Sequence, residues 1–240
     1  MIRFIFCGLL SLCIVARNAA TTVVVVWKKG QIIVATDSRM TDSNRNYLRS
    51  ECKIVVTDSF VFAMVGLTSD VDFDMREIAR RVSREEGALQ TKVEHFQQVA
   101  APKLQLSLER LKMREPLAFS SWMLKTQGGL TQAVFVRVAD KTPQVLLATF
   151  KASEQIDGIH LRNEIQIAQR NEGFLFMGTH THIDKHGDEF PKENGLTQWA
   201  AQLIEVEIGA DPAEVGGPVD VVQLDERGAK WIQAKGCVGE

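Results

Sequence analysis

The stretch Thr21-Thr22-Val23-Val24-Val25-Val26 follows a hydrophobic N-terminal segment and opens the part of the chain with the pattern of a folded domain. Its four valines are β-branched and favour a buried strand. A cut between Ala20 and Thr21 would give Thr21 a free α-amine beside its own hydroxyl. Such a residue carries a nucleophile and a general base together, which is one way to activate a threonine. The stretch therefore predicts a core strand and a candidate nucleophile.

Residues 1–20 have the pattern of a secretory signal peptide. Arg3 supplies a positive start, residues 4–16 are an almost unbroken apolar run, and small residues follow at Ala19 and Ala20. The apolar run is too short for a comfortable membrane span. We therefore expect residues 1–20 to be removed and the product to be exported, to a periplasm or to the medium. The alternatives are an uncleaved anchor and a buried N-terminal strand.

Residues 21–240 are expected to form a single domain. The chain has 240 residues, 45% of them hydrophobic and 24% charged, which is the ordinary globular range. A formal net charge of −2 argues against a nucleic-acid-binding protein, which usually has a basic excess. Cys7 and Cys13 would leave with the signal peptide. Cys52 lies in an apolar segment and is expected to be buried rather than paired, so no disulfide framework is predicted.

The hydrophobic pattern predicts strands, then two helices, then strands, a helix and a closing hairpin. Strands are expected at residues 23–27, 31–36, 53–56, 60–65, 118–124, 132–138, 144–150, 174–177, 218–224 and 229–233. Amphipathic spacing predicts helices at residues 70–86, 91–114 and 196–206. Pro102 should kink or split the second helix. Helices covering a mainly antiparallel double sheet would bury this apolar surface in one α+β domain.

Three residues are placed to support a nucleophile at Thr21. Asp37 ends the second expected strand 16 residues after Thr21, and Lys53 begins the third strand 16 residues after Asp37. A Lys–Asp pair at the edge of Ile/Val-rich strands is partly desolvated, and its attraction keeps both groups ionised. Its ammonium would stabilise the threonine alkoxide, and Gly66 would let a backbone N–H approach an oxyanion. A single strand-end Asp or Lys is more often a solvated residue, so the interpretation depends on the set.

This set resembles the β-type subunits of the proteasome and their bacterial relatives, which are N-terminal-nucleophile (Ntn) hydrolases. Thr21-Thr22 and the valines match the mature start of that family, and residues 31–39 are similar to its second-strand signature. Cys52-Lys53-Ile54-Val55 resembles the lysine segment, and Met64-Val65-Gly66 resembles the oxyanion strand. The likeness is strongest over residues 21–75 and returns at residues 216–231.

The resemblance implies a four-layer αββα sandwich and a threonine-type peptidase or amidohydrolase. Thr21 Oγ would attack an amide carbonyl, and water would hydrolyse the resulting acyl-enzyme. Asp37 would hold Lys53, Lys53 would tune the nucleophile, and the Gly66 N–H would stabilise the oxyanion. Thr179 occupies the place of a supporting serine in the family. This chemistry requires no cofactor and no metal.

The segment before Gly216 departs from the family pattern. The family has an Asp and a Ser ahead of its Gly-Gly pair, whereas this chain has Asp211 displaced by one position and Val215 in place of the serine. The outer supporting residues are therefore left open.

The resemblance also places Met40, Glu51, Val55 and Met64 near the pocket for the substrate side chain. Met64 would favour apolar groups and Glu51 basic ones, and the sequence does not choose between them.

His180, His182, Asp184 and His186 fall within seven residues and have the spacing of potential ligands for a transition metal. A solvated loop or a substrate contact explains the same cluster more simply.

The expected partner is a peptide or another amide substrate. The cytoplasmic members of the family form rings served by ATP-driven unfoldases. An exported chain would have no such unfoldase, and a homo-oligomer is left open. The alternatives are a non-peptide amidohydrolase such as an acylase, or a non-catalytic structural subunit. The presence of both Thr21 and Lys53 argues against the non-catalytic subunit.

Overall fold

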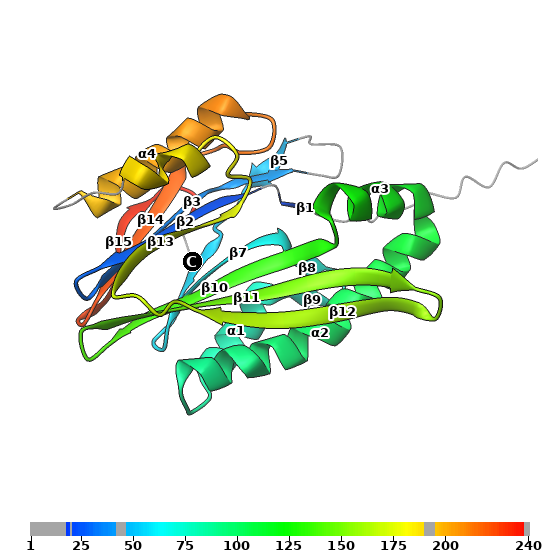
Figure 1. The fold of residues 1–240 in the computed structure, drawn as a ribbon, viewed down its shortest axis with the longest axis horizontal. Coiled ribbons are helices and arrows are strands. Elements are labelled where there is room, and N and C mark those ends of the chain that lie inside the picture. The colour runs from blue at the N-terminus through cyan, green and yellow to red at the C-terminus, as the bar shows by residue number, and fades with distance from the viewer. Residues whose placement is uncertain (1–17, 20, 42–46, 190–194, 238–240) are drawn as a thin grey trace, which may run out of the picture.

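The structure is a computed structural model that describes residues 18–19, 21–41, 47–189 and 195–237. Within this part of the chain, two antiparallel sheets pack face to face between helices (Figure 1). The strands of the first sheet are β1 (Asn18–Ala19), β6 (Ile54–Val56), β7 (Val61–Leu67), β10 (Gly129–Ala139), β11 (Thr142–Gln155) and β12 (Gly158–Ile167). They run in the order β1-β7-β10-β11-β12, with β6 also paired to β7.

The second sheet contains the candidate nucleophile stretch. Its strands are β2 (Thr22–Lys28), β3 (Gln31–Asp37), β13 (Glu172–Gly178), β14 (Val219–Asp225) and β15 (Gly228–Ala234). They run in the order β13-β2-β3-β14-β15, which places β2 in the interior of the sheet. Short hairpins are formed by β4 (Arg39–Thr41) with β5 (Tyr47–Ser50) and by β8 (Ser69–Asp70) with β9 (Phe73–Asp74).

Helices cover the outer face of each sheet. The structure contains α1 (Met75–Ser83), α2 (Leu89–Arg114), α3 (Pro116–Thr126), α4 (Leu196–Ala210) and the short 3-10 helix η1 (Asp184–Glu189). The α1 and α2 helices pack on the first sheet, and α4 packs on the second (Figure 1). The order of layers is therefore helix, sheet, sheet, helix, and the predicted αββα sandwich is confirmed.

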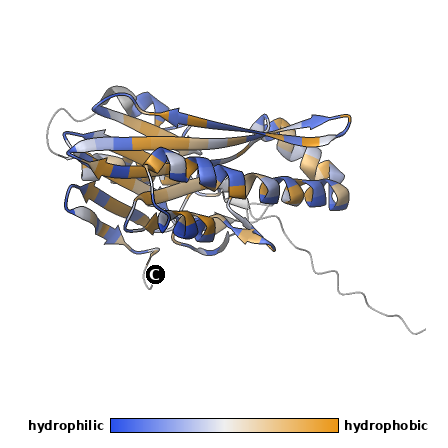
Figure 2. Cartoon of the chain, turned by 90° about the horizontal axis from the view of Figure 1, so that it is seen from below, coloured by the Kyte–Doolittle hydropathy of each residue, from blue (hydrophilic) through white to orange (hydrophobic). Residues whose placement is uncertain are grey.

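The valine run of β2 is buried along both faces. Val23 and Val25 belong to the cluster between the two sheets, while Val24 and Val26 belong to the cluster beneath α4. Successive side chains of a strand point to opposite faces. A strand covered on both faces therefore needs a continuous apolar run rather than alternation. Figure 2 shows the same distribution across the molecule, with the hydrophobic colours along the strands and the hydrophilic colours at the turns.

Most of the predicted strands and the predicted α4 helix are confirmed, but two elements differ. Residues 118–124 are not a strand, because they lie in α3, which begins with Pro116 at its first turn and ends at left-handed Gln127. Pro has no N–H to lose at that position and fits the start of a helix. The first helix begins at Met75 rather than at residue 70, since the Asp74 side chain accepts from Arg76 N and caps the helix there.

Two further features bear on the predictions. Pro102 lies inside α2, so the second helix is not split there. Cys52 is buried as expected but is not free, because it forms a disulfide with Cys237. The two cysteines are 185 residues apart in sequence, and their Cα atoms come within 4.5 Å only in the folded chain. No helix in the described part of the chain has the length and apolar character needed to cross a bilayer.

The hydrophobic core between the first sheet and helices α1 and α2 contains a cluster of phenylalanine rings, which gives a stability prediction. Phe135 of β10 is fully buried and has Phe60, Phe62 and Phe96 around its ring, with centroids 4.9 to 5.2 Å away. Phe135→Ala should lower the free energy of unfolding by about 3–5 kcal/mol, because it leaves a cavity in a packed core. Leu117→Ala, on the exposed face of α3, should change it by less than about 0.5 kcal/mol. Urea unfolding of both variants is the measurement, and equal losses would contradict the assigned core.

Candidate active site

Thr21 lies directly before β2 and is held by the end of β13. Thr179 N donates to the Thr21 carbonyl oxygen at 2.9 Å, and the Thr22 hydroxyl donates to the Thr179 carbonyl oxygen. Gly178 makes this approach possible, since its φ is +79° and a Cβ there would lie 1.8 Å from the Thr21 oxygen. Thr21 itself is only 1% exposed. The end of β13 therefore fixes the backbone around the candidate nucleophile.

The Asp37 carboxylate, at the end of β3, is completely buried and accepts four hydrogen bonds. Oδ1 accepts from Thr22 N at 3.0 Å and from Lys53 Nζ at 2.9 Å. Oδ2 accepts from Arg39 N at 3.2 Å and from Gly216 N at 3.1 Å. A buried carboxylate is tolerated only when its oxygens are paired in this way. The structure thus brings together the Asp37 and Lys53 side chains at the start of the Thr21 strand.

Lys53 lies just before β6 and is itself buried. Burial lowers the pKa of Lys53 because it disfavours the ammonium. The charge and hydrogen bond of Asp37 oppose that shift, and so do the charges of Glu51 and Asp220. A lysine with a lowered pKa beside a carboxylate is a group that functional sites often contain.

Gly66 lies near the end of β7 and has a φ of +92°. A Cβ there would lie 2.2 Å from the Leu130 carbonyl oxygen, so the position accepts only glycine. Gly66 pairs with Thr131 on β10 and with Ala19 on β1. Its backbone therefore lies beside the residues that precede Thr21.

Glu214 is the carboxylate that lies next to the Thr179 hydroxyl. The Thr179 hydroxyl lies 3.4 Å from Glu214 Oε2, and Lys125 Nζ of α3 lies 3.2 Å from Glu214 Oε1. Asp211 instead accepts from the Glu214 N–H in a local turn, and Val215 is fully buried. Sequence reasoning missed Glu214, although it directly precedes Val215, the residue that stands where the family has a serine.

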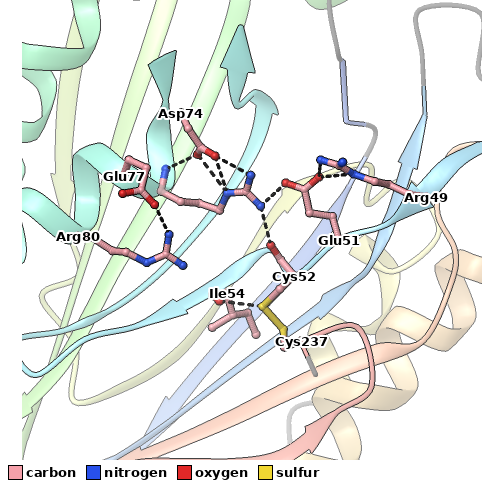
Figure 3. A network of polar contacts seen from close by, with 9 residues as sticks. Arg49, Glu51, Cys52, Ile54, Asp74, Glu77, Arg80 and Cys237 are labelled. Atoms are coloured by element: carbon pink, nitrogen blue, oxygen red, sulfur yellow. Dashed lines mark hydrogen bonds and ion pairs between the residues drawn. A yellow bond between two sulfur atoms is a disulfide. The ribbon is translucent and has the colours of Figure 1, made fainter. Parts of the chain in front are cut away.

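The Glu51 carboxylate is paired with two arginines (Figure 3). Oε2 lies 2.7 Å from Arg49 Nη2, and Oε1 pairs with Arg76, which also binds Asp74 at 2.7 Å. Because this charge is already compensated, Glu51 is a weak attractant for a basic substrate side chain. Met40, Val55 and Met64 are buried apolar residues.

The histidines after β13 point to separate carboxylates. His180 Nδ1 lies 2.7 Å from Asp184 Oδ1, and His182 Nδ1 lies 3.1 Å from Glu207 Oε1 on α4. Within the described ranges, no group of three or more His, Cys, Asp or Glu side chains is arranged to hold a metal ion. The His182–Glu207 contact instead joins this loop to α4.

The sequence and the structure were compared with known proteins. No protein-family model and no curated protein matches the sequence. The structure is similar to the solved structure of Anbu (ancestral beta-subunit) from Yersinia bercovieri, with a TM-score of 0.51 and 12% sequence identity. The match covers 89% of this chain and 88% of that chain. At this identity the likeness shows the fold alone, and that fold is the proteasome-like Ntn-hydrolase sandwich.

Gly178 provides a test of the backbone contact at Thr21. Gly178→Ala forces a methyl group against the Thr21 carbonyl oxygen, whereas Gly158→Ala, also at positive φ, has open space around it. Gly178→Ala should therefore be less stable than Gly158→Ala by about 2 kcal/mol or more. Thermal and urea unfolding measure the difference, and equal stabilities would mean that β13 does not approach Thr21 this closely.

The Asp37–Lys53 pair is tested by a double-mutant cycle on the free energy of unfolding. Asp37→Asn and Lys53→Met should each cost about 3–5 kcal/mol, because each leaves a buried charge without its partner. The double variant should be more stable than the sum of the single losses predicts, by about 1–3 kcal/mol. The exposed Asp225–Arg227 pair is the matched control and should give a coupling below about 1 kcal/mol. Additive losses at Asp37 and Lys53 would reject the pair.

Proposed function

We propose that the mature chain is an exported N-terminal-threonine hydrolase that cleaves peptide or other amide bonds through an acyl-enzyme on Thr21. The observation that carries the proposal is the buried carboxylate of Asp37, which binds Lys53 Nζ and the backbone of the Thr21-Thr22 stretch together. The proteasome-like Ntn-hydrolase fold supports the same reading.

Each group has one role in the proposed reaction. The free α-amine of Thr21 takes the proton from Oγ as Oγ attacks the amide carbonyl, and it then returns a proton to the leaving amine. The Gly66 N–H stabilises the oxyanion of the tetrahedral intermediate. Lys53, held by Asp37, stabilises the developing alkoxide and keeps the α-amine neutral. Water then attacks the ester, and Thr21 Oγ leaves with its proton. Thr179 supports the nucleophile from β13, with Glu214 behind its hydroxyl.

The pairing of β1 supports a mode of substrate binding. The backbone of Asn18 and Ala19 lies antiparallel to β7, opposite Leu67 and Gly66. The segment before Thr21 thus occupies a strand position next to the candidate oxyanion glycine. Once this segment is removed, we propose that an extended substrate main chain takes the same position as an added strand. Peptides fit that position better than compact amides do.

Two observations support an exported product. Residues 1–20 have the signal-peptide pattern, and Cys52 is joined to Cys237, which is a pairing typical of oxidising compartments. In such a compartment, we propose that the enzyme acts without an ATP-driven unfoldase. The similarity to a protein described as an ancestral β-subunit supports a homo-oligomer as a further part of the proposal.

The N-terminus of the mature protein and its reactivity test the proposal. Intact-mass and N-terminal analysis should find Thr21 first, and a threonine-directed electrophile should label it. Thr21→Ala should abolish labelling because the nucleophile is gone. Lys53→Ala should slow it by at least about 100-fold, within the range of a lost electrostatic stabiliser.

A mature chain extended by Ala19-Ala20 is the matched control, since its Thr21 amine stays in a peptide bond and should not react. Circular dichroism checks that every variant is folded. A native mature form that begins before Thr21, or unchanged labelling of folded Lys53→Ala, would reject the mechanism.

A further inference from the structure

The Cys52–Cys237 disulfide joins the two sheets at the candidate active site. Cys52 directly precedes Lys53 and leads into β6 of the first sheet, while Cys237 follows β15 of the second sheet. Both cysteines are buried. The bond therefore connects the backbone of the lysine segment to the C-terminal segment of the chain.

The lysine segment is held from its other side by Arg76, near the start of α1. Arg76 Nη1 donates to the Cys52 carbonyl oxygen at 3.4 Å and also pairs with Glu51. Figure 3 shows Cys52 next to Cys237, with Glu51 beyond it on the side of Arg49. With the disulfide intact, the backbone before Lys53 is anchored on two sides.

The C-terminal segment covers a second buried carboxylate. Gly236 N donates to Asp220 Oδ1 at 2.7 Å, and Asp220 is completely buried. A Cβ at Gly236 would lie 2.4 Å from Asp220 Oδ2 and 2.5 Å from Ser38 Cβ. The segment therefore packs in contact with Asp220 and with Ser38, the residue after Asp37.

The charge of Asp220 interacts with the charges of Asp37 and Lys53. Burial raises the pKa of Asp220, the N–H groups of Gly236 and Lys235 oppose that shift, and the charge of Asp37 adds to it. Asp220 in turn acts on the pKa of Lys53, which it raises. Entry of water would remove the burial of Asp220 and the N–H groups that oppose it, and would so change the interaction of Asp220 with the Lys53 ammonium.

We propose that the Cys52–Cys237 disulfide is a positioning element of the candidate active site, which keeps the C-terminal segment closed over Asp220 beside Lys53, so that Thr21 reaches full reactivity only in the disulfide-bonded chain. The proposal rests on the proposed function. A dithiol breaks the bond by exchange: the S–S bond opens, Cys52 and Cys237 each become a thiol, and the dithiol is oxidised to its own disulfide. The C-terminal segment is then free to leave, and water reaches Asp220.

The mature chain is suited to a direct test because Cys52 and Cys237 are the two cysteines that remain after residues 1–20 are removed. The rate of Thr21 labelling is measured against pH for the disulfide-bonded chain, for the chain treated with dithiothreitol, and for the Cys52→Ser, Cys237→Ser double variant. A thiol reagent must count two free thiols per reduced chain. All rates are taken at a temperature at which circular dichroism shows each form to be folded.

We expect the reduced chain and the double variant to label at least about 10-fold more slowly near pH 7 than the disulfide-bonded chain. Their pH profiles should be displaced from that of the disulfide-bonded chain, because hydration of Asp220 changes its effect on the pKa of Lys53. Reoxidation should restore the rate, and dithiothreitol should not affect the double variant.

The Gly236→Ala variant tests the packing of the C-terminal segment over Asp220 while the Cys52–Cys237 disulfide stays intact. It keeps both cysteines but places a methyl group against Asp220 and Ser38, so it should displace the pH profile in the same direction. Gly209→Ala in α4, where a Cβ meets nothing within 4 Å, is the matched control and should leave the profile unchanged.

The outcomes distinguish the two proposals. If the disulfide-bonded mature chain is not labelled at Thr21, the proposed function fails and this inference fails with it. If labelling is equal with and without the disulfide, the inference is overturned while the proposed function stands. A lower rate with an unchanged pH profile would also overturn it, because general destabilisation would then explain the loss.

Discussion

The buried carboxylate of Asp37 is the interaction on which the rest of the site depends. Its four hydrogen bonds come from the start of β2, from the segment before β6, from the start of β4 and from the segment before β14. An unpaired carboxylate in this position would cost several kcal/mol. The requirement to pair its oxygens therefore fixes the relative positions of segments that are far apart in the chain, and the Thr21 stretch is one of them.

Two close backbone contacts near Thr21 require glycine. At Gly178 and Gly66 a side chain would meet a carbonyl oxygen of a neighbouring segment. These two positions let β13 contact Thr21 and let β7 turn its backbone beside the residues before Thr21. The resulting arrangement places Thr21, Asp37 and Lys53 in a largely apolar interior, where electrostatic interactions are stronger.

Further contacts surround the candidate active site on two sides. Glu214 provides a carboxylate next to Thr179, and Lys125 of α3 pairs with it. The Cys52–Cys237 bond and Gly236 close the opposite side over Asp220. The contacts around Thr179 and Asp220 therefore join segments that lie far apart in the chain.

The sequence by itself determined the layers and the spacing of the central residues, because buried strands and amphipathic helices leave strong periodic signals. The valine run of β2, the strand-end Asp37 and Lys53, and Gly66 are local features, readable one segment at a time. It misplaced residues 118–124, whose apolar composition suits a strand or a helix equally. It also did not indicate β12, an edge strand in which polar residues make up half of the sequence. Only the tertiary structure decided that Cys52 is paired, that Glu214 reaches Thr179 and that Gly236 covers Asp220. Each of these contacts joins residues distant in sequence, and pairing at such a distance depends on packing, which no local pattern of residues records.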